Sequence, residues 1–532
     1  MFQSVESRDN KERRKYMKKV KKLVAVLLVG VMTLTCLTAC GDKEGSNKAT
    51  GDAAVDIEIN YWNAGLGREW LDAVAQAFIE EYPQYNAVIM ASASVPTVKA
   101  TLGMENDTVD LYLLNTQTNT SVMEPLDDIL TSTAKGDTVT IGEKFSDAYL
   151  ALQKAADGHY YQLTYGGGVI GIVYNTEHFK EAGVEQLPRT TNELAIACDK
   201  LNKAGKKAFC HYTPTGYWDF MGDTWFSQYE GIDYYLNNFY ACKDTNGTSP
   251  SKDVLTKKDG RYEVLKVYGK IITPEYVMEG SNSIDHVNAQ TQFLNGSASM
   301  MVTGSWISSE MASFENFDSF KMMRTPVISA ITDKCTTVKS EKALRDVISA
   351  IDMIADGEKK ESDFADGENF KVGDLSVSAA DWNYIYGARL SVPTNYSGEG
   401  ALIPKYSENK EGAKEFLRFL YSDKGQQIYA EKTKVPMPLN LSDGSTVDTK
   451  EMNTFQKSQY QMLAEARVTP TFENAGMHRI FVDGGASTYM DINYISYLCA
   501  SNPKDRKTVN QIWDLVIQEV EDNYETWLSD IK

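Results

Sequence analysis

The stretch from residue 292 to residue 306 constrains the fold of this chain more tightly than any other part of the sequence. Phe293 and Leu294 close an apolar helical turn. The Asn-Gly pair that follows can end the helix, because glycine tolerates the left-handed conformation that a helix C-cap requires. Residues 298–302 then form a short run bounded by turn residues, which is typical of a buried strand.

Trp306 follows Gly304 and Ser305 at the carboxyl end of this predicted strand. Open α/β sheets bind ligands in the crevice outside the carboxyl ends of their strands, so a large flat ring at this position can serve as a stacking surface. The alternative is that Trp306 simply fills a hydrophobic core. The chemistry of the residue leaves both interpretations open.

The beginning of the chain after residue 54 alternates between strand and helix patterns. Residues 57–61 alternate apolar and polar side chains and predict a strand. Residues 70–78 carry their apolar side chains on one helical face, and residues 87–90 and 109–114 form two further apolar runs. The order of strand, helix and strand predicts a βαβ unit and a parallel sheet.

A triple glycine at residues 166–168 precedes a β-branched run at residues 169–174. Three glycines before a strand indicate a bend, a hinge or a close approach of two backbones. A phosphate-binding loop is excluded, because neither the glycine spacing nor a following lysine fits a nucleotide loop. Asn175 can begin a short helix that Gly183 ends.

The order of phenylalanine, Asn-Gly, alanine, methionine and Gly-Ser-Trp within residues 293–306 resembles one family. It is similar to the extracellular solute-binding proteins of carbohydrate ABC transporters, in the larger maltodextrin- and multiple-sugar-type group. The opening strand, loop and helix that close at Tyr82-Pro83 match this family as well. The triple-glycine segment resembles its first crossover between lobes, and residues 396–405 resemble its return crossover. The resemblance spans residues 55–532.

The resemblance implies an α/β, two-lobed periplasmic-binding-protein-like fold of the class II type, with hinged lobes and a central ligand cleft. Lobe one is expected over residues 55–165 with 397–430. Lobe two is expected over residues 166–396 with 431–532.

Residues 331–387 form an insertion in lobe two, where the typical family member is more compact. Apolar side chains at helical spacing predict a helix over residues 344–354. Residues 356–374 are acidic and lysine-rich and predict an exposed loop. The insertion could extend lobe two or wall one end of the cleft. After it, Pro503 is predicted to open a final helix whose apolar stripe packs on the core.

The resemblance and the side-chain chemistry together predict the ligand contacts. Aromatic rings can cover the apolar faces of a sugar, whereas amides and carboxylates bond its hydroxyl groups. Asn115 could instead cap a helix, and Glu399 could pair with a surface lysine. The predicted ligand-binding residues are Trp62, Asn63, Glu69, Asn115, Gln117, Tyr165, Trp218, Asp219, Trp225, Trp306, Tyr396 and Glu399.

The N-terminal segment predicts export from the cell. Residues 18–22 are lysine-rich, residues 23–37 are apolar, and small residues precede Cys40. This pattern predicts a signal peptide over residues 1–39, and Met17 could be the true start. The four residues that end at Cys40 form the box of a bacterial lipoprotein, which implies cleavage before Cys40 and acylation of its thiol. A transmembrane helix is the alternative, but the apolar run is short for one.

Residues 40–54 are then a lipid anchor and flexible tether. A lipid-anchored protein of this kind lies on the outer face of the cytoplasmic membrane, here of a bacterium of the Gram-positive type. The formal net charge of −19 argues against nucleic acid as a partner. The cysteines beyond Cys40 are five in number and lack metal-ligand spacing, so they predict buried free thiols, with at most two disulfides, no metal and no cofactor.

These features predict a substrate-binding lipoprotein of an ABC importer. The protein is expected to be a monomer that captures a carbohydrate, specifically an oligosaccharide, between its lobes and delivers it to the permease subunits. It is not expected to be an enzyme. The same scaffold could instead bind a peptide, a polyamine or a metal chelate, because a fold does not fix its ligand. A glycoside hydrolase would need two carboxylates facing one bond, and Asp219, Asp223, Asp381 and Glu399 lie in no catalytic motif.

Overall fold

The computed structural model describes residues 46–47, 54–63, 65–92, 102, 104, 107–115, 120–155, 157–210, 217–396, 399–466 and 492–530. The chain divides into two compact units, Met1–Lys48 and Ala49–Lys532. The predicted signal peptide, Cys40 and Gln117 lie outside the described residues, and the first unit contributes only β1 (Ser46–Asn47). No helix in the described part of the chain is long and apolar enough to cross a membrane.

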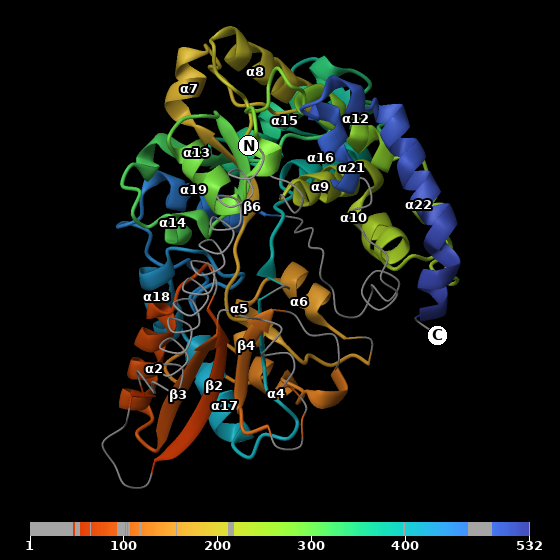
Figure 1. The fold of residues 1–532 in the computed structure, drawn as a ribbon. Helices are drawn as coiled ribbons and strands as arrows, with labels where there is room; N and C mark the ends of the chain where they lie inside the picture. The colour runs from red at the N-terminus through yellow and green to blue at the C-terminus, as the bar shows by residue number, and fades with distance from the viewer. Residues whose placement is uncertain are drawn as a thin grey trace, which may run out of the picture. The chain divides into compact units, whose positions relative to one another are not determined.

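Five strands of the second unit form an open mixed sheet in the order β3-β2-β4-β12-β5 (Figure 1). They are β2 (Val55–Trp62), β3 (Tyr85–Ser92), β4 (Leu111–Asn115), β5 (Leu163–Thr164) and β12 (Glu399–Leu402). β2 pairs in parallel with β3 and β4, which confirms the predicted βαβ unit, whereas β12 is antiparallel to β4 and β5.

The core of this sheet's lobe is built on α2 (Glu69–Glu81), which connects β2 and β3. Its predicted apolar face is buried, and Phe78 contacts Phe416 and Phe419 edge-to-face at centroid distances of 5.2 and 5.8 Å. Both partners belong to α17 (Lys410–Leu420), which is followed by α18 (Asp423–Thr433). Each fully buried side chain of this kind contributes about 2 kcal/mol through lost contact with water. The short helices α4 (Asp127–Leu130), α5 (Ile141–Lys144) and α6 (Asp147–Gln153) complete the lobe.

A second, antiparallel sheet has β6 at its centre, between β7 and β8. These strands are β6 (Ile170–Asn175), β7 (Met300–Gly304) and β8 (Phe320–Met323). β7 lies two residues beyond the predicted strand, because Ser297 to Ser299 continue the turn after the helix. The predicted C-cap is confirmed, with Asn295 capping the preceding helix and Gly296 at φ 82°.

Helices surround this second sheet (Figure 1). They are α7 (Thr176–Glu181), α8 (Thr191–Lys203), α9 (Trp218–Glu230), α10 (Ile232–Tyr234), α11 (Asp253–Thr256), α12 (Arg261–Ile271), α13 (His286–Leu294), α14 (Ile307–Glu310), α19 (Thr454–Glu465), α21 (Ile492–Ile495) and α22 (Val509–Asp530). The apolar stripe of α22 is buried, as predicted. The helix begins at Val509 because Pro503–Asp505 forms a separate 3-10 turn.

The insertion contains α15 (Glu341–Ala355), which confirms the predicted helix, and α16 (Ala379–Arg389). The segment after α15 is exposed, as predicted, but the prediction that it is an irregular loop is wrong. Its residues form a small antiparallel sheet of β9 (Ala365–Asp366), β10 (Asn369–Val372) and β11 (Leu375–Val377). Phe370 stacks on Trp382 of α16, with centroids 4.3 Å apart and rings 8° from parallel. Phe364 also contacts Trp382, at a centroid distance of 5.8 Å, so two aromatic rings anchor the charged segment.

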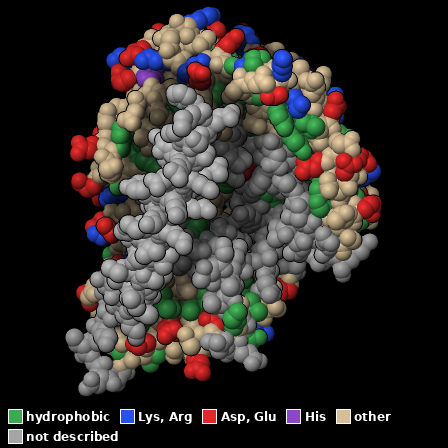
Figure 2. Space-filling view, in the orientation of Figure 1, with side chains coloured by type: hydrophobic (Ala, Val, Ile, Leu, Met, Phe, Trp, Pro, Cys, Tyr) green, Lys and Arg blue, Asp and Glu red, His purple; other side chains and the backbone are tan. Residues whose placement is uncertain are grey.

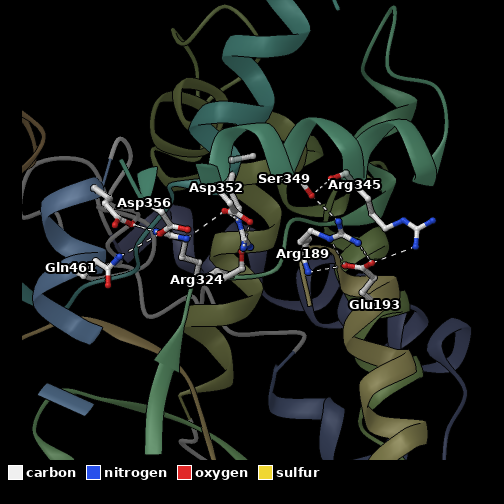
Figure 3. Close-up of polar contacts among 12 residues, drawn as sticks. Arg189, Glu193, Arg324, Arg345, Ser349, Asp352, Asp356 and Gln461 are labelled. Carbon is white, nitrogen blue, oxygen red and sulfur yellow. Dashed lines mark hydrogen bonds and ion pairs between the residues drawn. The ribbon is translucent and has the colours of Figure 1, made fainter. Parts of the chain in front are cut away.

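Ion pairs join the insertion to the rest of its lobe (Figure 3). Asp352 of α15 lies 3.6 Å from the guanidinium of Arg324, a residue outside the insertion. Arg324, just after β8, contacts Asp356 at 2.6 Å and Glu465 of α19 at 2.8 Å. Although burial opposes its charge, these carboxylates hold the pKa of Arg324 above its ordinary value.

A second group of polar contacts lies beside this one in Figure 3. Arg189 donates to Ser349 of α15 at 2.7 Å and to Glu193 of α8 at 2.6 Å. Arg345 of α15 reaches the same Glu193 at 3.4 Å. The insertion is therefore an integral part of the second sheet's lobe and contacts it along most of α15.

Apolar residues form separate clusters around the two sheets, which is the two-lobed arrangement that the sequence predicts. Met437 belongs to the cluster of the first sheet, whereas Phe455 and Met462 of α19 belong to a cluster of the second. The cysteines Cys198, Cys210, Cys242, Cys335 and Cys499 are free thiols. On the face shown in Figure 2, acidic and basic side chains are interspersed over the described surface.

Candidate ligand-binding site

Four predicted site residues meet at one edge of the first sheet. Asn115 ends β4 and pairs in register with Glu399, which begins β12. Trp62 ends β2, the neighbour of β4 on the other side. Tyr165 donates its backbone N–H to the Glu399 carbonyl at 3.1 Å. The carboxyl ends of the parallel strands therefore bring an indole, an amide-bearing residue and a carboxylate to the position where α/β sheets bind ligands.

Tyr165 holds the Glu399 side chain in place. Its hydroxyl donates to Oε2 of Glu399 at 2.5 Å. The Tyr165 ring is buried, stacking on Trp70 at 6.1 Å and meeting Tyr61 edge-on at 5.9 Å. Burial, with the nearby Glu399 charge, raises the pKa of Tyr165 well above its ordinary value, so it remains a donor at neutral pH.

Trp306 directly precedes α14 and belongs to the other lobe. Its side chain is 7% exposed and belongs to the hydrophobic cluster of the second sheet. A Cβ added at Gly304 would lie 2.2 Å from atoms of the Trp306 ring. Tyr217 packs on the other side at a centroid distance of 5.1 Å. Glycine at position 304 thus lets the indole fold back over its own strand.

Ser305, between these two residues, joins the motif to the first crossover. Its backbone N–H donates to the Val169 carbonyl at 3.0 Å, and its Oγ accepts from the Val169 N–H at 3.1 Å. A Cβ added at Gly168 would lie 2.6 Å from the Ser305 Cβ. Each of the three residues of the Gly-Ser-Trp sequence therefore makes a different packing contact that favours its residue type. Sequence reasoning missed Ser305, because its partner Val169 lies far away in the sequence.

The triple glycine marks a close approach of two backbones. Val169 forms an antiparallel bridge with Thr394 of the return crossover. Gly168 donates its N–H to Oδ1 of Asn395 at 2.8 Å. Gly167 has φ 93°, and a Cβ there would lie 3.0 Å from the same oxygen. The first and return crossovers consequently form one paired connection between the lobes.

Tyr396 belongs to this connection in the described structure. Its ring is buried in the cluster of the first sheet, and its hydroxyl donates to the Pro436 carbonyl at 2.6 Å. Pro436 lies on the chain segment that passes between the lobes for the third time. The structure thus gives Tyr396 a structural contact at the crossovers.

The two indoles predicted as stacking surfaces on α9 lie in the core. Trp218 is 1% exposed and meets Phe209 edge-on at 4.9 Å. Trp225 is 0% exposed and donates its Nε1–H to the Pro326 carbonyl at 3.0 Å. Their spacing of seven residues puts both on one helical face, a signal that sequence reasoning overlooked.

The remaining predicted site residues lie on α9 and in the loop between β2 and α2. Asp219 lies in the first turn of α9 and accepts from the Phe220 N–H at 2.9 Å. Asn63 and Glu69 are exposed, at the two ends of the loop between β2 and α2. Among the described residues no group of three or more His, Cys, Asp or Glu side chains could hold a metal ion.

The two lobes also meet directly at Gly65, in the same loop. A Cβ added at Gly65 would lie 3.0 Å from Oε1 of Glu310 and 3.2 Å from the Cβ of Trp306. The adjacent Leu66 packs on Gly166, where an added Cβ would lie 2.4 Å from the Leu66 Cδ1. The loop that carries Asn63 is therefore enclosed between Trp306 and the first crossover.

Two lobes, each built on its own sheet and joined by paired crossovers, define a solute-binding protein. A family profile described as bacterial extracellular solute-binding protein matches residues 64–427. The chain therefore belongs to this family, which confirms the resemblance found in the sequence. No curated protein matches the chain.

Solved structures share the fold at low sequence identity. The bacterial solute receptor AcbH, which prefers β-D-galactopyranose, is 13% identical, with a TM-score of 0.60 over 88% of this chain and 98% of its own. RafE from Streptococcus pneumoniae is 14% identical, with a TM-score of 0.57 over 88% and 98%. The GacH receptor of Streptomyces glaucescens, solved with acarbose, is 14% identical, with a TM-score of 0.56 over 90% and 100%.

Proposed function

We propose that the protein is the carbohydrate receptor of an ABC importer. It captures an oligosaccharide between its lobes and delivers it to the permease subunits. The observation that carries this proposal is the meeting of Trp62, Asn115 and Glu399 at one sheet edge, with Trp306 on the facing lobe. Structural relatives have been solved with raffinose, mannobiose and acarbose, and these ligands support the same class.

The chemistry of these residues suits a neutral, hydroxyl-rich ligand. Glu399, fixed by Tyr165, accepts hydrogen bonds from sugar hydroxyls, and such charge-assisted bonds are stronger than neutral ones. Asn115 and Gln117 supply amides that both donate and accept. The rings of Trp62 and Trp306 cover the apolar faces of the sugar. Asn63, Glu69 and Asp219 add polar groups at the rim.

The proposal includes the export and anchoring that the N-terminal sequence predicts. The signal peptide is removed before Cys40, and acyl chains on that thiol hold a monomeric receptor at the outer face of the cytoplasmic membrane. Labelling of the cells with a radioactive or clickable palmitate tests this step. A wild-type protein that takes up label and a Cys40→Ala variant that does not would support it.

The carboxylates considered for glycoside hydrolysis have structural partners. Asp381 accepts from the backbone N–H groups of Thr336, Thr337 and Val338. Asp223 accepts from the Tyr235 hydroxyl at 3.0 Å. These contacts account for both side chains without a reaction, and the family consists of binding proteins.

The decisive experiment is a thermal-shift screen of the chain without residues 1–40 against mono- and oligosaccharides, with a peptide and a polyamine as comparison. A ligand at 100 times its dissociation constant stabilises the folded state by about 2.7 kcal/mol. We expect one class of oligosaccharide to raise the melting temperature of the wild type. The same oligosaccharide should raise the melting temperature of Glu399→Gln by less. A shift with the peptide or the polyamine alone would replace the proposal with a non-sugar receptor.

A further inference from the structure

The buried Tyr61 hydroxyl contacts the start of α2 from the carboxyl end of β2. Tyr61 is the residue of β2 that precedes Trp62, and its side chain lies in the apolar cluster of the first sheet. The hydroxyl donates to the main-chain carbonyl of Gly67 at 2.6 Å and accepts from Nε1–H of Trp70 at 3.2 Å. One buried group therefore bonds both the loop that enters α2 and the first turn of the helix.

The start of α2 depends on this contact, because the helix has no side-chain cap of its own. Its N-cap residue is Arg68, whose side chain makes no capping hydrogen bond. The Arg68 guanidinium is paired with Asp72 instead, with Nε 3.1 Å from the carboxylate. Gly67 has φ 67°, in the left-handed region that favours glycine. The carbonyl that this turn presents is therefore held by Tyr61 rather than by a capping residue.

Glu69, the first residue of α2, lies between the two residues that Tyr61 bonds. Its side chain is exposed and forms no hydrogen bond or ion pair with any residue in the described part of the chain. The neighbouring Arg68 is already paired with Asp72. A carboxylate with unused acceptor positions is suited to the hydroxyl groups of a sugar. The two bonds of Tyr61, one on each side of Glu69, fix the backbone that carries this carboxylate.

The aromatic group around Tyr61 also supports the second carboxylate of the proposed site. The Tyr61 ring meets Trp70 and Tyr165 edge-on, with centroid distances of 5.8 and 5.9 Å. Tyr165 in turn holds Glu399 through its own hydroxyl. Burial raises the pKa of Tyr61 above its ordinary value, so its hydroxyl remains a donor at neutral pH. Two carboxylates of the site therefore depend on hydroxyl groups from one set of packed rings.

We propose that Tyr61 is a positioning residue of the ligand-binding site, whose hydroxyl holds Glu69 in the orientation that bonds the sugar. This inference rests on the proposed function, because Glu69 is a predicted sugar contact. Tyr61 is 1% exposed, so it acts through Glu69 and does not touch the ligand. The variant Tyr61→Phe removes the hydroxyl and keeps the packing of the ring.

The first test is hydrogen exchange in ligand-free, full-length wild type, Tyr61→Phe and the control Tyr384→Phe. The amides of residues 71–72 donate to the Arg68 carbonyl and report on the start of α2. We expect their exchange to accelerate about fivefold in Tyr61→Phe, because one net hydrogen bond is lost. The Tyr384 hydroxyl also donates to a main-chain carbonyl, that of Tyr229 in the other lobe, so the control should leave these amides unchanged. Unchanged exchange in Tyr61→Phe would overturn the proposal.

The second test determines whether Tyr61 acts through Glu69. Raffinose, mannobiose and acarbose, with which structural relatives have been solved, serve as probes in calorimetric titrations. We expect Tyr61→Phe to weaken binding at least about threefold in the wild-type background and to add nothing in the Glu69→Gln background, because residues that act as a unit are not additive. Tyr384→Phe should leave the affinity unchanged.

An equal loss of affinity from Tyr61→Phe in both backgrounds would show that the hydroxyl has only a structural effect, and would overturn the proposal. If none of the three sugars binds, that result counts against the proposed function alone. The exchange comparison then still decides whether Tyr61 holds the start of α2, because it uses the protein without a ligand.

Discussion

The buried Tyr165 side chain has one role in stability and a second role in the proposed binding site. Its ring packs in the first sheet's core, while its hydroxyl positions Glu399. A hydrogen bond of this kind, to a charged and half-buried acceptor, contributes about 1.5–3 kcal/mol. The hydroxyl group therefore makes a substantial contribution to the free energy of folding.

Tyr165→Phe should lower the free energy of unfolding by about 1–2 kcal/mol, because Glu399 loses its donor while the packing of the ring is kept. The same change should weaken the best oligosaccharide ligand, since the carboxylate is no longer oriented. Chemical denaturation and calorimetric titration measure the two effects. Tyr161→Phe is the matched control, because the Tyr161 hydroxyl bonds Asp157 at the exposed surface. Equal effects of the two variants would contradict the assigned role.

The role of a single residue could be predicted from the sequence only where its contacts are with neighbouring residues in the chain. Asn295 and Gly296 were predicted correctly as a helix end, because capping involves only neighbouring residues. Ser305 was missed because its partner, Val169, is set by tertiary packing. The site predictions at Trp62, Asn115 and Glu399 depended on the family resemblance, and their contact with ligand stays a prediction.

Among the elements, long amphipathic helices were the most predictable. α2 and α15 repeat their apolar side chains at helical spacing over three turns or more, so the pattern is unambiguous. β9, β10 and β11 span two to four residues each, too few for an alternating pattern to emerge above the charged background. The stacking of Phe370 on Trp382, which fixes them, joins segments that are not adjacent in the sequence.

Phe370→Ala should therefore destabilise the small sheet of the insertion. Removal of a half-buried ring that stacks on an indole should cost about 2 kcal/mol, less than the full value for a completely buried phenylalanine. Hydrogen exchange over residues 365–377 should accelerate more than exchange in β6. Lys371→Ala is the control, since the neighbouring side chain is exposed. Unchanged exchange in Phe370→Ala would mean that the sheet has another anchor.

At the scale of the whole molecule, Asn395 bonds the two crossovers to one another. Its Oδ1 accepts from the Gly168 N–H, and its own N–H donates to the Gly168 carbonyl at 3.2 Å. The bend that the glycines allow is local, but the relation between the lobes depends on this contact between residues far apart in the sequence. The sequence therefore predicted two lobes without predicting how they meet.

Asn395→Ala should leave the Gly168 N–H without its side-chain acceptor and lower the free energy of unfolding by about 1 kcal/mol. It should also broaden the range of lobe arrangements in small-angle scattering, because the paired crossovers are held less firmly. Asn316→Ala, at an exposed position in lobe two, is the control. Scattering profiles that coincide for the two variants would show that backbone pairing alone sets the relation between the lobes.

Strand β12 lies between β4 and β5, yet it is made only after residues 166–396 of lobe two. During synthesis and export, which proceed from the N-terminus, the first lobe's sheet has a gap until residue 402 has left the ribosome. An unfilled strand position is an open template for pairing with other chains, and long-range closure of this kind is slow. The sheet of the lobe that is made first is thus completed only after residues 166–396 of the other lobe have been made, so the growing chain needs protection from aggregation until β12 arrives.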